Sequence, residues 1–385
     1  MEAIMGNDSK REYITILRLR YSNSTKKQKS IILDEFCATF NHNRKYAIRV
    51  LQPPSDKAKT PKGRKKKYSP ECEHHLRKLW MIMDQMCSKR MAAAMPMWIP
   101  FYEVDESLRK ELLSMSPATI DRTLHPFRSE LSRKLRSGTK PGRLIKNQIP
   151  IKPFDFNIQE PGFVEADTVA HCGNSLSGEF IWSITLTDIY SGWTENRAVM
   201  GKGSAGVLSS LKDMEKALPF PLKGFNSDNG SELLNYHILR FLKDKGVEHT
   251  RSRAYKKNDN CHVEQKNWTH VRQIFGYERF DQRELIPLMN EFYCSEQSLL
   301  QNFFFPQVKL IRKIRIGSKY KFTYSKPLTP YQRLMACEAI SNEKKDYLKA
   351  IFDTLNPIEL KSKRQEKIKN FLKVITKKFD QKNVA

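Results

Sequence analysis

Three acidic residues in the middle of the chain have the types and positions expected of a metal-binding site. Asp167 lies near the end of an apolar run, Asp228 directly follows another such run, and Glu264 falls in the first turn of an expected helix. Carboxylates are hard oxygen ligands of the kind that Mg²⁺ and Mn²⁺ prefer, and substrate phosphates and waters complete the Mg²⁺ shell. Two such ions can activate a water or hydroxyl and stabilise the leaving oxygen during phosphoryl transfer. The three acids therefore predict a site for that chemistry.

The elements around these acids are expected to form a mixed α/β domain. Short apolar or alternating runs predict strands, and apolar residues at helical spacing predict helices. The expected strands are 163–169, 179–189, 193–200, 222–227 and 247–253, and the expected helices are 204–218, 233–245 and a third that carries Glu264. Three strands followed by helix, strand, helix, strand and helix is the element order of the ribonuclease-H-like fold. We therefore expect a mixed five-stranded sheet with helices.

Two segments resemble a known family. SDNGSEL at 227–233 resembles the DNGxEF segment of integrase-type catalytic cores, and YKKNDNCHVEQKNWTHVR at 255–272 resembles the helix that carries the last acid in the same group. With 35 residues between Asp228 and Glu264, the chain resembles DDE transposases and retroviral-type integrases, in particular bacterial insertion-sequence transposases with an integrase catalytic core. The resemblance covers residues 161–280.

The resemblance implies a DNA transposase. Asp167, Asp228 and Glu264 would be the catalytic residues and the metal ligands, with two Mg²⁺ ions bound and Mn²⁺ able to substitute. The reaction would be metal-dependent cleavage at the 3′ ends of a mobile element, followed by strand transfer of the 3′-hydroxyl into target DNA. Two alternatives remain: a structure-selective nuclease of the ribonuclease-H-like fold, and a DNA-binding repressor with an inactive core.

The distribution of charge indicates a polyanionic partner. The chain holds 68 Lys and Arg against 42 Asp and Glu, a net charge of +26. Residues 1–160 hold 32 basic and 17 acidic side chains, residues 161–280 hold 15 and 14, and residues 281–385 hold 21 and 11. Residues 1–160 and 281–385 thus form two basic arms on either side of a near-neutral centre, and such arms suit the binding of DNA phosphates. We expect double-stranded DNA, as element ends and as target, to be the partner, and the family leads us to expect at least a dimer on DNA.

Composition divides the chain into seven expected segments. The first, 1–58, is expected to be a helical, helix-turn-helix-like DNA-binding domain. Its sequence predicts two short helices joined by a tight turn, and the second of these helices is basic. The others are a basic linker at 59–68, a second helical DNA-binding domain at 69–150, a connector at 151–160, the integrase catalytic core at 161–280, an amphipathic helix and small basic β unit at 281–337, and a basic helical tail at 338–385.

Basic side chains in the arms and beside the core are candidate DNA contacts. They are Arg44, Lys45, Arg49, Arg64, Lys65, Lys66, Lys67, Arg122, Lys256, Lys257, Lys266 and Arg272. The run at 57–68 suits phosphate contact without sequence choice, and a solvated surface run is the alternative. Trp268, four residues after Glu264, stands where retroviral integrases usually place a DNA-contacting lysine, so the chain departs from that pattern.

Other residues near the acids admit both a functional and an ordinary interpretation. His171 could touch a metal-bound water or a phosphate, but a hydrogen-bonding histidine at a strand end is the simpler expectation. Asn229 could contact phosphate in a tight turn with Gly230, or it could serve only the turn between strand and helix. Cys261 and His262 diverge by about 100° on a helix, so we expect no zinc site there.

Composition excludes several other classes of protein. Hydrophobic residues make up 39% of the chain, enough to bury several cores, and no apolar run reaches the length of a transmembrane helix. The start MEAIMGNDSK lacks the apolar stretch of a secretory signal. We therefore expect a cytoplasmic protein with no membrane partner, and the resemblance implies a bacterial one that is associated with the nucleoid when bound to DNA. Seven cysteines without a CxxC pair predict reduced thiols.

Overall fold

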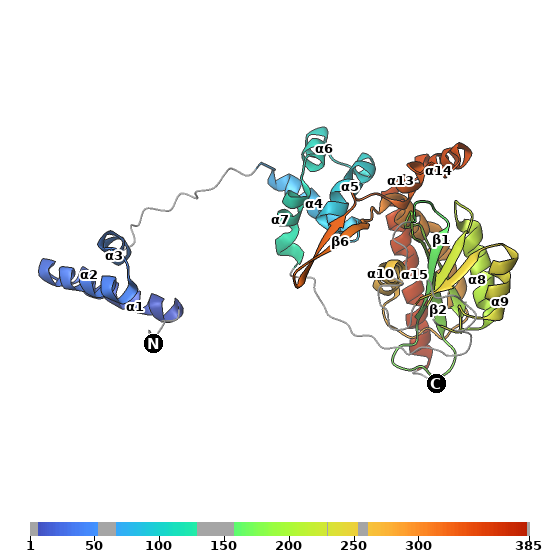
Figure 1. The fold of residues 1–385 in the computed structure, drawn as a ribbon, viewed down its shortest axis with the longest axis horizontal. Helices are drawn as coiled ribbons and strands as arrows, with labels where there is room; N and C mark the ends of the chain where they lie inside the picture. Colours follow the sequence, from blue (N-terminus) through green and yellow to red (C-terminus); the bar gives the residue numbers. More distant parts are fainter. Residues whose placement is uncertain (1–6, 53–66, 129–157, 229, 253–260, 383–385) are drawn as a thin grey trace. The chain divides into compact units, whose positions relative to one another are not determined.

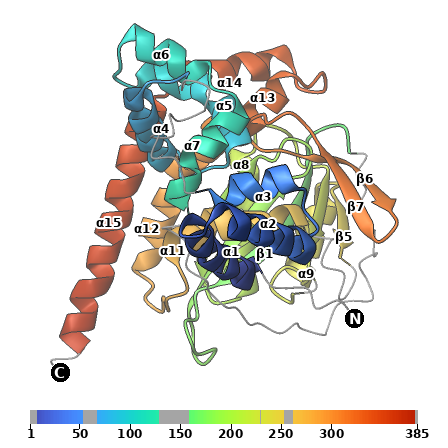
Figure 2. The ribbon, with the colours of Figure 1, turned by 90° about the vertical axis from the view of Figure 1, so that its left-hand side faces the viewer.

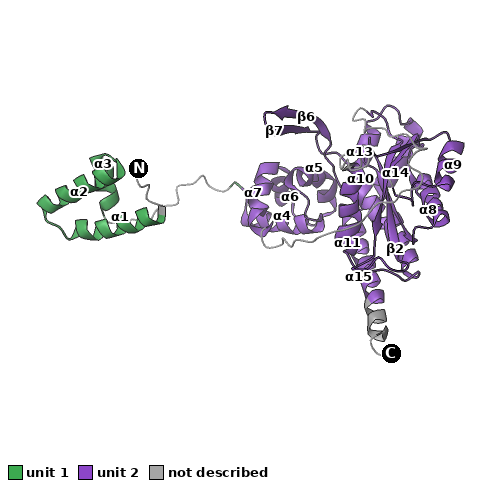
Figure 3. Cartoon of the chain, turned by 60° about the horizontal axis from the view of Figure 1, so that its bottom comes forward, with its two compact units in different colours: residues 1–67 green, residues 68–385 purple. Residues whose placement is uncertain are grey.

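The chain folds into two compact units, Met1–Lys67 and Tyr68–Ala385 (Figure 3). The computed structural model describes residues 7–52, 67–128, 158–228, 230–252 and 261–382. Among the described residues, no helix is long and apolar enough to cross a membrane. Six predicted contact residues lie outside the described residues, namely Arg64, Lys65, Lys66, Asn229, Lys256 and Lys257.

The first unit contains three helices around a small apolar core. They are α1 (Asn7–Ser22), α2 (Lys26–Phe40) and α3 (Arg44–Leu51). α2 ends at Asn41, whose backbone adopts the left-handed conformation that asparagine tolerates (φ 50°). Asn43 then caps α3 by accepting a hydrogen bond from the Tyr46 backbone N–H. The expected pair of helices about a tight turn is confirmed, whereas α1 is an additional helix that packs Leu17 against Phe36.

The second unit begins with four helices. They are α4 (Pro70–Ile82), α5 (Ser88–Trp98), α6 (Glu106–Leu113) and α7 (Pro117–Arg128). Ser69 caps α4 by accepting a hydrogen bond from the Cys72 backbone N–H, and Pro70 occupies its first turn. Trp98 is fully buried, and its indole N–H donates to the carbonyl of Phe304 at 3.2 Å. These helices therefore share one apolar core with the chain that follows the sheet.

A five-stranded mixed sheet forms the centre of the second unit. Its strands are β1 (Phe163–Ala170), β2 (Ile181–Asp188), β3 (Thr194–Met200), β4 (Gly224–Ser227) and β5 (Glu248–Arg251), in the order β3-β2-β1-β4-β5. β1, β2 and β3 pair antiparallel, whereas β1, β4 and β5 pair parallel. α8 (Ser204–Ala217) and α9 (Tyr236–Asp244) lie to one side of the sheet, with α10 (Cys261–Lys266) and α15 (Pro357–Lys382) to the other (Figure 1). The predicted element order and ribonuclease-H-like sheet are confirmed.

The helix that carries Glu264 changes from α-helical to π-helical and back along its length. Three consecutive segments make up this helix: α10, a π-helical stretch Asn267–Arg272, and α11 (Gln273–Phe275). A π turn takes more residues than an α turn, and such stretches are frequent at functional sites. Gly276 ends the helix with a positive φ of 68°.

The C-terminal part contains helices and one hairpin. α12 (Leu285–Phe292) continues through two π-helical stretches, Tyr293–Gln297 and Leu300–Phe304. β6 (Leu310–Ile316) and β7 (Lys319–Tyr324) form a hairpin that projects from the unit (Figure 2). α13 (Pro330–Met335), α14 (Asn342–Thr354) and α15 complete the chain. The expected amphipathic helix, small β unit and helical tail are present.

Candidate active site

The strand register places two of the three acids side by side. β1 and β4 pair in parallel, with Ala166 opposite Ser227 at the end of their shared register. The residues that follow are Asp167, within β1, and Asp228, directly after β4, so the two acids lie on neighbouring strands at the carboxyl edge of β4. This edge is where α/β sheets place their ligand sites.

Two side chains fasten the helix of Glu264 to β1. Glu165 Oε2 accepts hydrogen bonds from the backbone N–H groups of His262 and Val263, each at 3.0 Å. A carboxylate there satisfies two N–H groups that a helix start leaves unpaired. Further along, the Asn267 side-chain amide donates to Asp167 Oδ2 at 2.7 Å. Because these contacts flank Glu264 in sequence, they hold its turn against the strand that carries Asp167.

All three acids line one cleft with a volume of about 1130 Å³. Asp167 and Asp228 are partly buried in it, whereas Glu264 is exposed. The helix contributes Glu264, Asn267, Trp268 and Arg272 to the lining, and the turn after β3 contributes Lys202. The structure thus brings together, in one accessible site, the acids that the sequence places in three separate elements.

The electrostatics of the cleft favour a cation. Burial, followed by repulsion from Asp228 and then Glu264, raises the pKa of Asp167 to about 8. Burial likewise raises the pKa of Glu165 to about 8, although its two backbone donors oppose the shift. Carboxylates gathered in a shielded place repel one another, and a divalent cation would relieve that repulsion.

The donor set fits a divalent metal ion. Hard carboxylate oxygens are what Mg²⁺ prefers, and Asn267 Oδ1 and Glu165 Oε1 are buried oxygens for which the described residues supply no hydrogen-bond donor. Among the described residues, no three His, Cys, Asp or Glu side chains stand close enough to form a metal cage by themselves. Mg²⁺ is usually bound through one or two carboxylates, with waters and substrate phosphates in the rest of its shell.

Sequence reasoning missed two charged residues of the cleft. Glu232 is buried, and its Oε1 accepts a hydrogen bond from the Thr168 hydroxyl at 2.9 Å. The Lys202 ammonium pairs with the other oxygen of Glu232 at 2.9 Å and lies 4.1 Å from the centroid of the Trp182 ring. Glu232 is the acid of the SDNGSEL segment, so the motif contained the signal, whereas nothing local marks Lys202 in the turn after β3.

His171 belongs to the core of the protein. Its side chain is fully buried, shares a hydrogen bond with the Ser183 hydroxyl at 2.8 Å, and stacks on Phe280. Ser183 in turn shares a hydrogen bond with the Tyr293 hydroxyl at 2.8 Å. Burial, and then the charge of Arg272, lowers the pKa of His171 to about 3. The imidazole is thus used in packing and lies outside the cleft lining, which agrees with the simpler of the two interpretations rather than with a water or phosphate contact.

Two predicted DNA-contacting residues, Lys266 and Arg272, lie on the helix that carries Glu264, and one is buried whereas the other lines the cleft. Lys266 is only 7% exposed and lies outside the cleft lining, and burial lowers its pKa well below the usual value. DNA does not reach its ammonium in this conformation, which corrects that expectation. Arg272 lines the cleft, donates to the carbonyls of Ala170 at 2.9 Å and Gly276 at 3.2 Å, and lies over the Tyr277 ring.

The predicted DNA-contacting residues of the N-terminal helices are exposed. Arg44, Lys45 and Arg49 lie on α3, where Arg44 forms an ion pair with Asp34. Lys67 and Arg122 are also exposed, Arg122 on α7. Their roles remain predictions.

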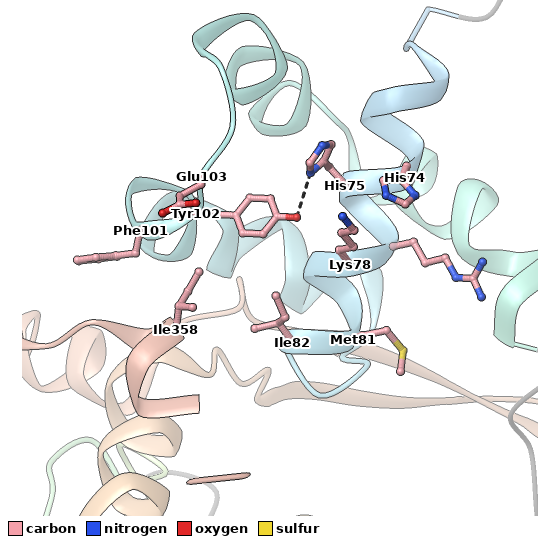
Figure 4. A pocket seen from close by; sticks show the side chains of 10 residues that line it. His74, His75, Lys78, Met81, Ile82, Phe101, Tyr102, Glu103 and Ile358 are labelled. Carbon is pink, nitrogen blue, oxygen red and sulfur yellow. Dashed lines mark hydrogen bonds between the residues drawn. The ribbon is translucent and has the colours of Figure 1, made fainter. Parts of the chain in front are cut away.

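A second cavity, of about 670 Å³, lies beside α4. Figure 4 shows His75 of α4 facing Tyr102, with Glu103 and Ile358 also lining the space. His75 Nδ1 and the Tyr102 hydroxyl lie 3.0 Å apart in a hydrogen bond. Glu103 is the one carboxylate of its lining, so this cavity lacks the paired acids that metal-dependent phosphoryl transfer needs.

Known proteins share this core. Residues 159–257 match the family model of the integrase core domain, a span that includes Asp167 and Asp228. The uncharacterized protein y4rM of Sinorhizobium fredii is 36% identical over 329 residues, which cover 84% of this chain and 94% of that protein. The chain belongs to the integrase and transposase superfamily.

One solved structure is a more distant likeness. A chain in the cryo-EM structure of the simian T-cell lymphotropic virus intasome in complex with PP2A regulatory subunit B56 gamma is 17% identical, with a TM-score of 0.31. The alignment covers 52% of this integrase-type chain and 65% of that one. At this level of similarity, nothing about the site follows from it.

Proposed function

We propose that this integrase-family protein is a DDE-type DNA transposase. The observation that supports the proposal best is the shared cleft: the β1–β4 register sets Asp167 beside Asp228, and the helix fastened to β1 brings Glu264 to the same cleft. Acids that converge from two strands and a helix suit two-metal phosphoryl transfer, in which no serine or tyrosine nucleophile is needed.

Five residues in or beside the cleft have a role in this proposal. Asp167, Asp228 and Glu264 would hold divalent metal, Mg²⁺ by preference. When bound, Mg²⁺ activates the attacking water or 3′-hydroxyl and stabilises the leaving oxygen. Asn267 fixes the orientation of Asp167 through their 2.7 Å hydrogen bond. Glu165 keeps the Glu264 turn against β1, so the spacing of the acids is set before DNA arrives.

The basic arms would hold the DNA. The exposed cations of α3, Arg44, Lys45 and Arg49, suit contact with phosphates, as do the cations of the β6–β7 hairpin. We propose that the segment 1–58 and the helices within 69–150 bind the element ends, and that the segments after the core support binding and assembly. Bringing two element ends together requires at least two copies of the chain.

A strand-transfer assay tests the proposed function. Labelled duplexes from the DNA on either side of the reading frame are incubated with supercoiled plasmid, Mg²⁺ and the full-length chain. Joined product that disappears with Asp167→Asn, and persists with the matched surface change Asp346→Asn, supports a transposase. Cleavage without joining favours the structure-selective nuclease, and binding without either reaction favours the repressor with an inactive core.

A further inference from the structure

A fourth acid lies in the cleft beside the three carboxylates. Glu232 belongs to the SDNGSEL segment, lines the cleft and is only 4% exposed. Its Oε1 accepts a hydrogen bond from the Thr168 hydroxyl, and its Oε2 pairs with the Lys202 ammonium, each at 2.9 Å. We propose that Glu232 is a positioning residue, which links the turn that begins at Asp228 to the strand that carries Asp167. This inference rests on the proposed function.

The backbone pairing between β1 and β4 ends where the acids begin. Its last pair joins Ala166 to Ser227, and β4 itself ends at Ser227. Asp228 therefore lies just outside this ladder, and Asp167 lies one residue beyond the last pair. Metal ligands keep a productive spacing only when neighbouring side chains hold them in place. A link beyond the end of the ladder is thus needed to hold the two acids at a fixed separation.

The hydrogen bond between Thr168 and Glu232 provides this link. Thr168 follows Asp167 on β1, and its backbone N–H donates to Asp167 Oδ1 at 2.7 Å. Glu232 lies four residues after Asp228, in the turn that follows β4. The hydroxyl of Thr168 therefore joins the residue that orients one acid to the turn that begins at the other. Because the acceptor is a buried carboxylate, this hydrogen bond belongs to the stronger, charge-assisted class.

Gly230 leaves the space that this arrangement needs. Its backbone N–H donates to Asp228 Oδ1 at 2.9 Å. A Cβ atom at this position would lie 2.8 Å from Glu232 Oε1 and 2.9 Å from Asp228 Oδ1, closer than a Cβ comes to other atoms. Both carboxylates therefore approach the backbone of one residue, and any side chain there would displace at least one of them. The glycine thus allows Glu232 to fold back over the turn towards β1.

Lys202 offsets the charge that Glu232 brings into the cleft. A buried carboxylate beside other acids costs free energy unless a cation pairs with it. The Lys202 ammonium makes this pair and also lies 4.1 Å from the centroid of the Trp182 ring, so it is held from two sides. With Oε2 bound to Lys202 and Oε1 to Thr168, both oxygens of Glu232 have partners within the protein. A positioning role therefore suits Glu232 better than a place among the metal ligands.

Mn²⁺ binding without DNA tests this link. Isothermal titration calorimetry measures the Mn²⁺ affinity of the full-length chain, and urea unfolding in EDTA measures its stability separately. Thr168→Val removes the hydroxyl at nearly constant size, and Glu232→Asp keeps the charge but withdraws the carboxylate by one methylene. We expect each change to weaken Mn²⁺ binding about tenfold, the lower end of the effect of losing a supporting partner. Because both changes break the same hydrogen bond, the double variant should lose no more than the larger single loss.

Two controls separate the link from a general effect of substitution. Thr168→Ser keeps the hydroxyl and should bind Mn²⁺ as the wild type does. Thr354→Val makes the same change as Thr168→Val at an exposed position of α14, outside the cleft, and should leave the affinity unaltered. Thr168→Ala replaces Thr168→Val if the latter does not fold.

The remaining outcomes would overturn the inference. They are a wild type that does not bind Mn²⁺, a Thr168→Val variant that loses only stability and keeps the wild-type affinity, and single losses that multiply in the double variant. A chain that joins DNA while Thr168→Val leaves its Mn²⁺ affinity unchanged contradicts this inference alone. A Mn²⁺ affinity that depends on the Thr168 hydroxyl, in a chain that neither cuts nor joins DNA, contradicts the proposed function alone.

Discussion

The Asn267 side-chain amide donates to Asp167 Oδ2 at 2.7 Å, and this hydrogen bond joins the helix of Glu264 to the central strand of the sheet. This hydrogen bond restricts the rotation of the Asp167 carboxylate. The other oxygen of that carboxylate, Oδ1, accepts a hydrogen bond from the Thr168 backbone N–H at 2.7 Å. Both oxygens of Asp167 are thus oriented by neighbours from different elements. A partner of this kind fixes the orientation of a metal ligand.

Asn267→Ala should weaken the use of metal without unfolding the protein. Loss of an orienting partner typically costs about 10- to 100-fold in metal affinity or activity. We therefore expect strand joining to require a higher Mg²⁺ concentration and to fall by about that factor at limiting Mg²⁺. A Mg²⁺ titration of the joining rate measures this, with the exposed Asn342→Ala on α14 as the matched control. An unchanged Mg²⁺ dependence would show that Asn267 does not act through Asp167.

Glu165→Ala should destabilise the protein through the start of α10. The change leaves the buried backbone N–H groups of His262 and Val263 without their acceptor, which costs about 1–3 kcal/mol for each buried group left unpaired. Glu165→Gln keeps a carbonyl oxygen that can accept both backbone hydrogen bonds. We expect Glu165→Gln to be much the milder change.

Urea unfolding at pH 7 measures the effect of the Glu165 changes. The midpoint for Glu165→Ala should be lowest, Glu165→Gln should lie near the wild type, and Glu366→Ala, which alters an exposed acid of α15, should match the wild type. If Glu165→Ala and Glu366→Ala unfold at the same urea concentration, the two hydrogen bonds do not anchor the helix.

His171 should make the protein sensitive to acid. Its pKa is about 3 when folded, against 6.5 as the usual value, so between these limits the unfolded chain binds a proton that the folded chain excludes. Stability then falls as the pH drops below 6.5, by up to about 1.4 kcal/mol per pH unit from this group. His171→Gln removes the contribution of this group and should make the decline between pH 6 and pH 4.5 shallower, while His249 and His262, whose pKa values burial also lowers, keep theirs. Unfolding free energies at pH 6 and pH 4.5 test it, and an equal decline in both proteins would contradict the assignment.

The order of elements and the positions of the acids could be predicted from local signals. Strands and helices follow from the period of the apolar residues, and Asp228 and Glu264 stand at element boundaries that turn residues mark. The resemblance to integrase-type cores then indicated that Asp167, Asp228 and Glu264 belong to one site. The parallel pairing of β1 and β4, which places Asp167 beside Asp228, is a long-range arrangement that the periodicity alone does not determine.

The supporting residues could not be predicted, because each depends on burial that local pattern does not reveal. A charged or polar side chain is expected at the surface, yet Glu165 and His171 are buried in or beside β1. Lys266 lies three residues after the buried Val263, so helical spacing could have placed it inward, but its charge argued for solvent. The π-helical stretch after Lys266 has no sequence signature.

The most direct test of the central claim compares the three acids in one strand-joining measurement. The initial rate of joining of a labelled element end to supercoiled plasmid in Mg²⁺ is measured for the wild type, Asp167→Asn, Asp228→Asn, Glu264→Gln and the control Asp346→Asn. If the acids form one metal-dependent site, each of the first three variants should lose at least about a thousandfold in rate, or about 4 kcal/mol of barrier lowering, while the control stays near the wild type. A near-normal joining rate in Asp167→Asn, Asp228→Asn or Glu264→Gln would contradict the assignment of that acid.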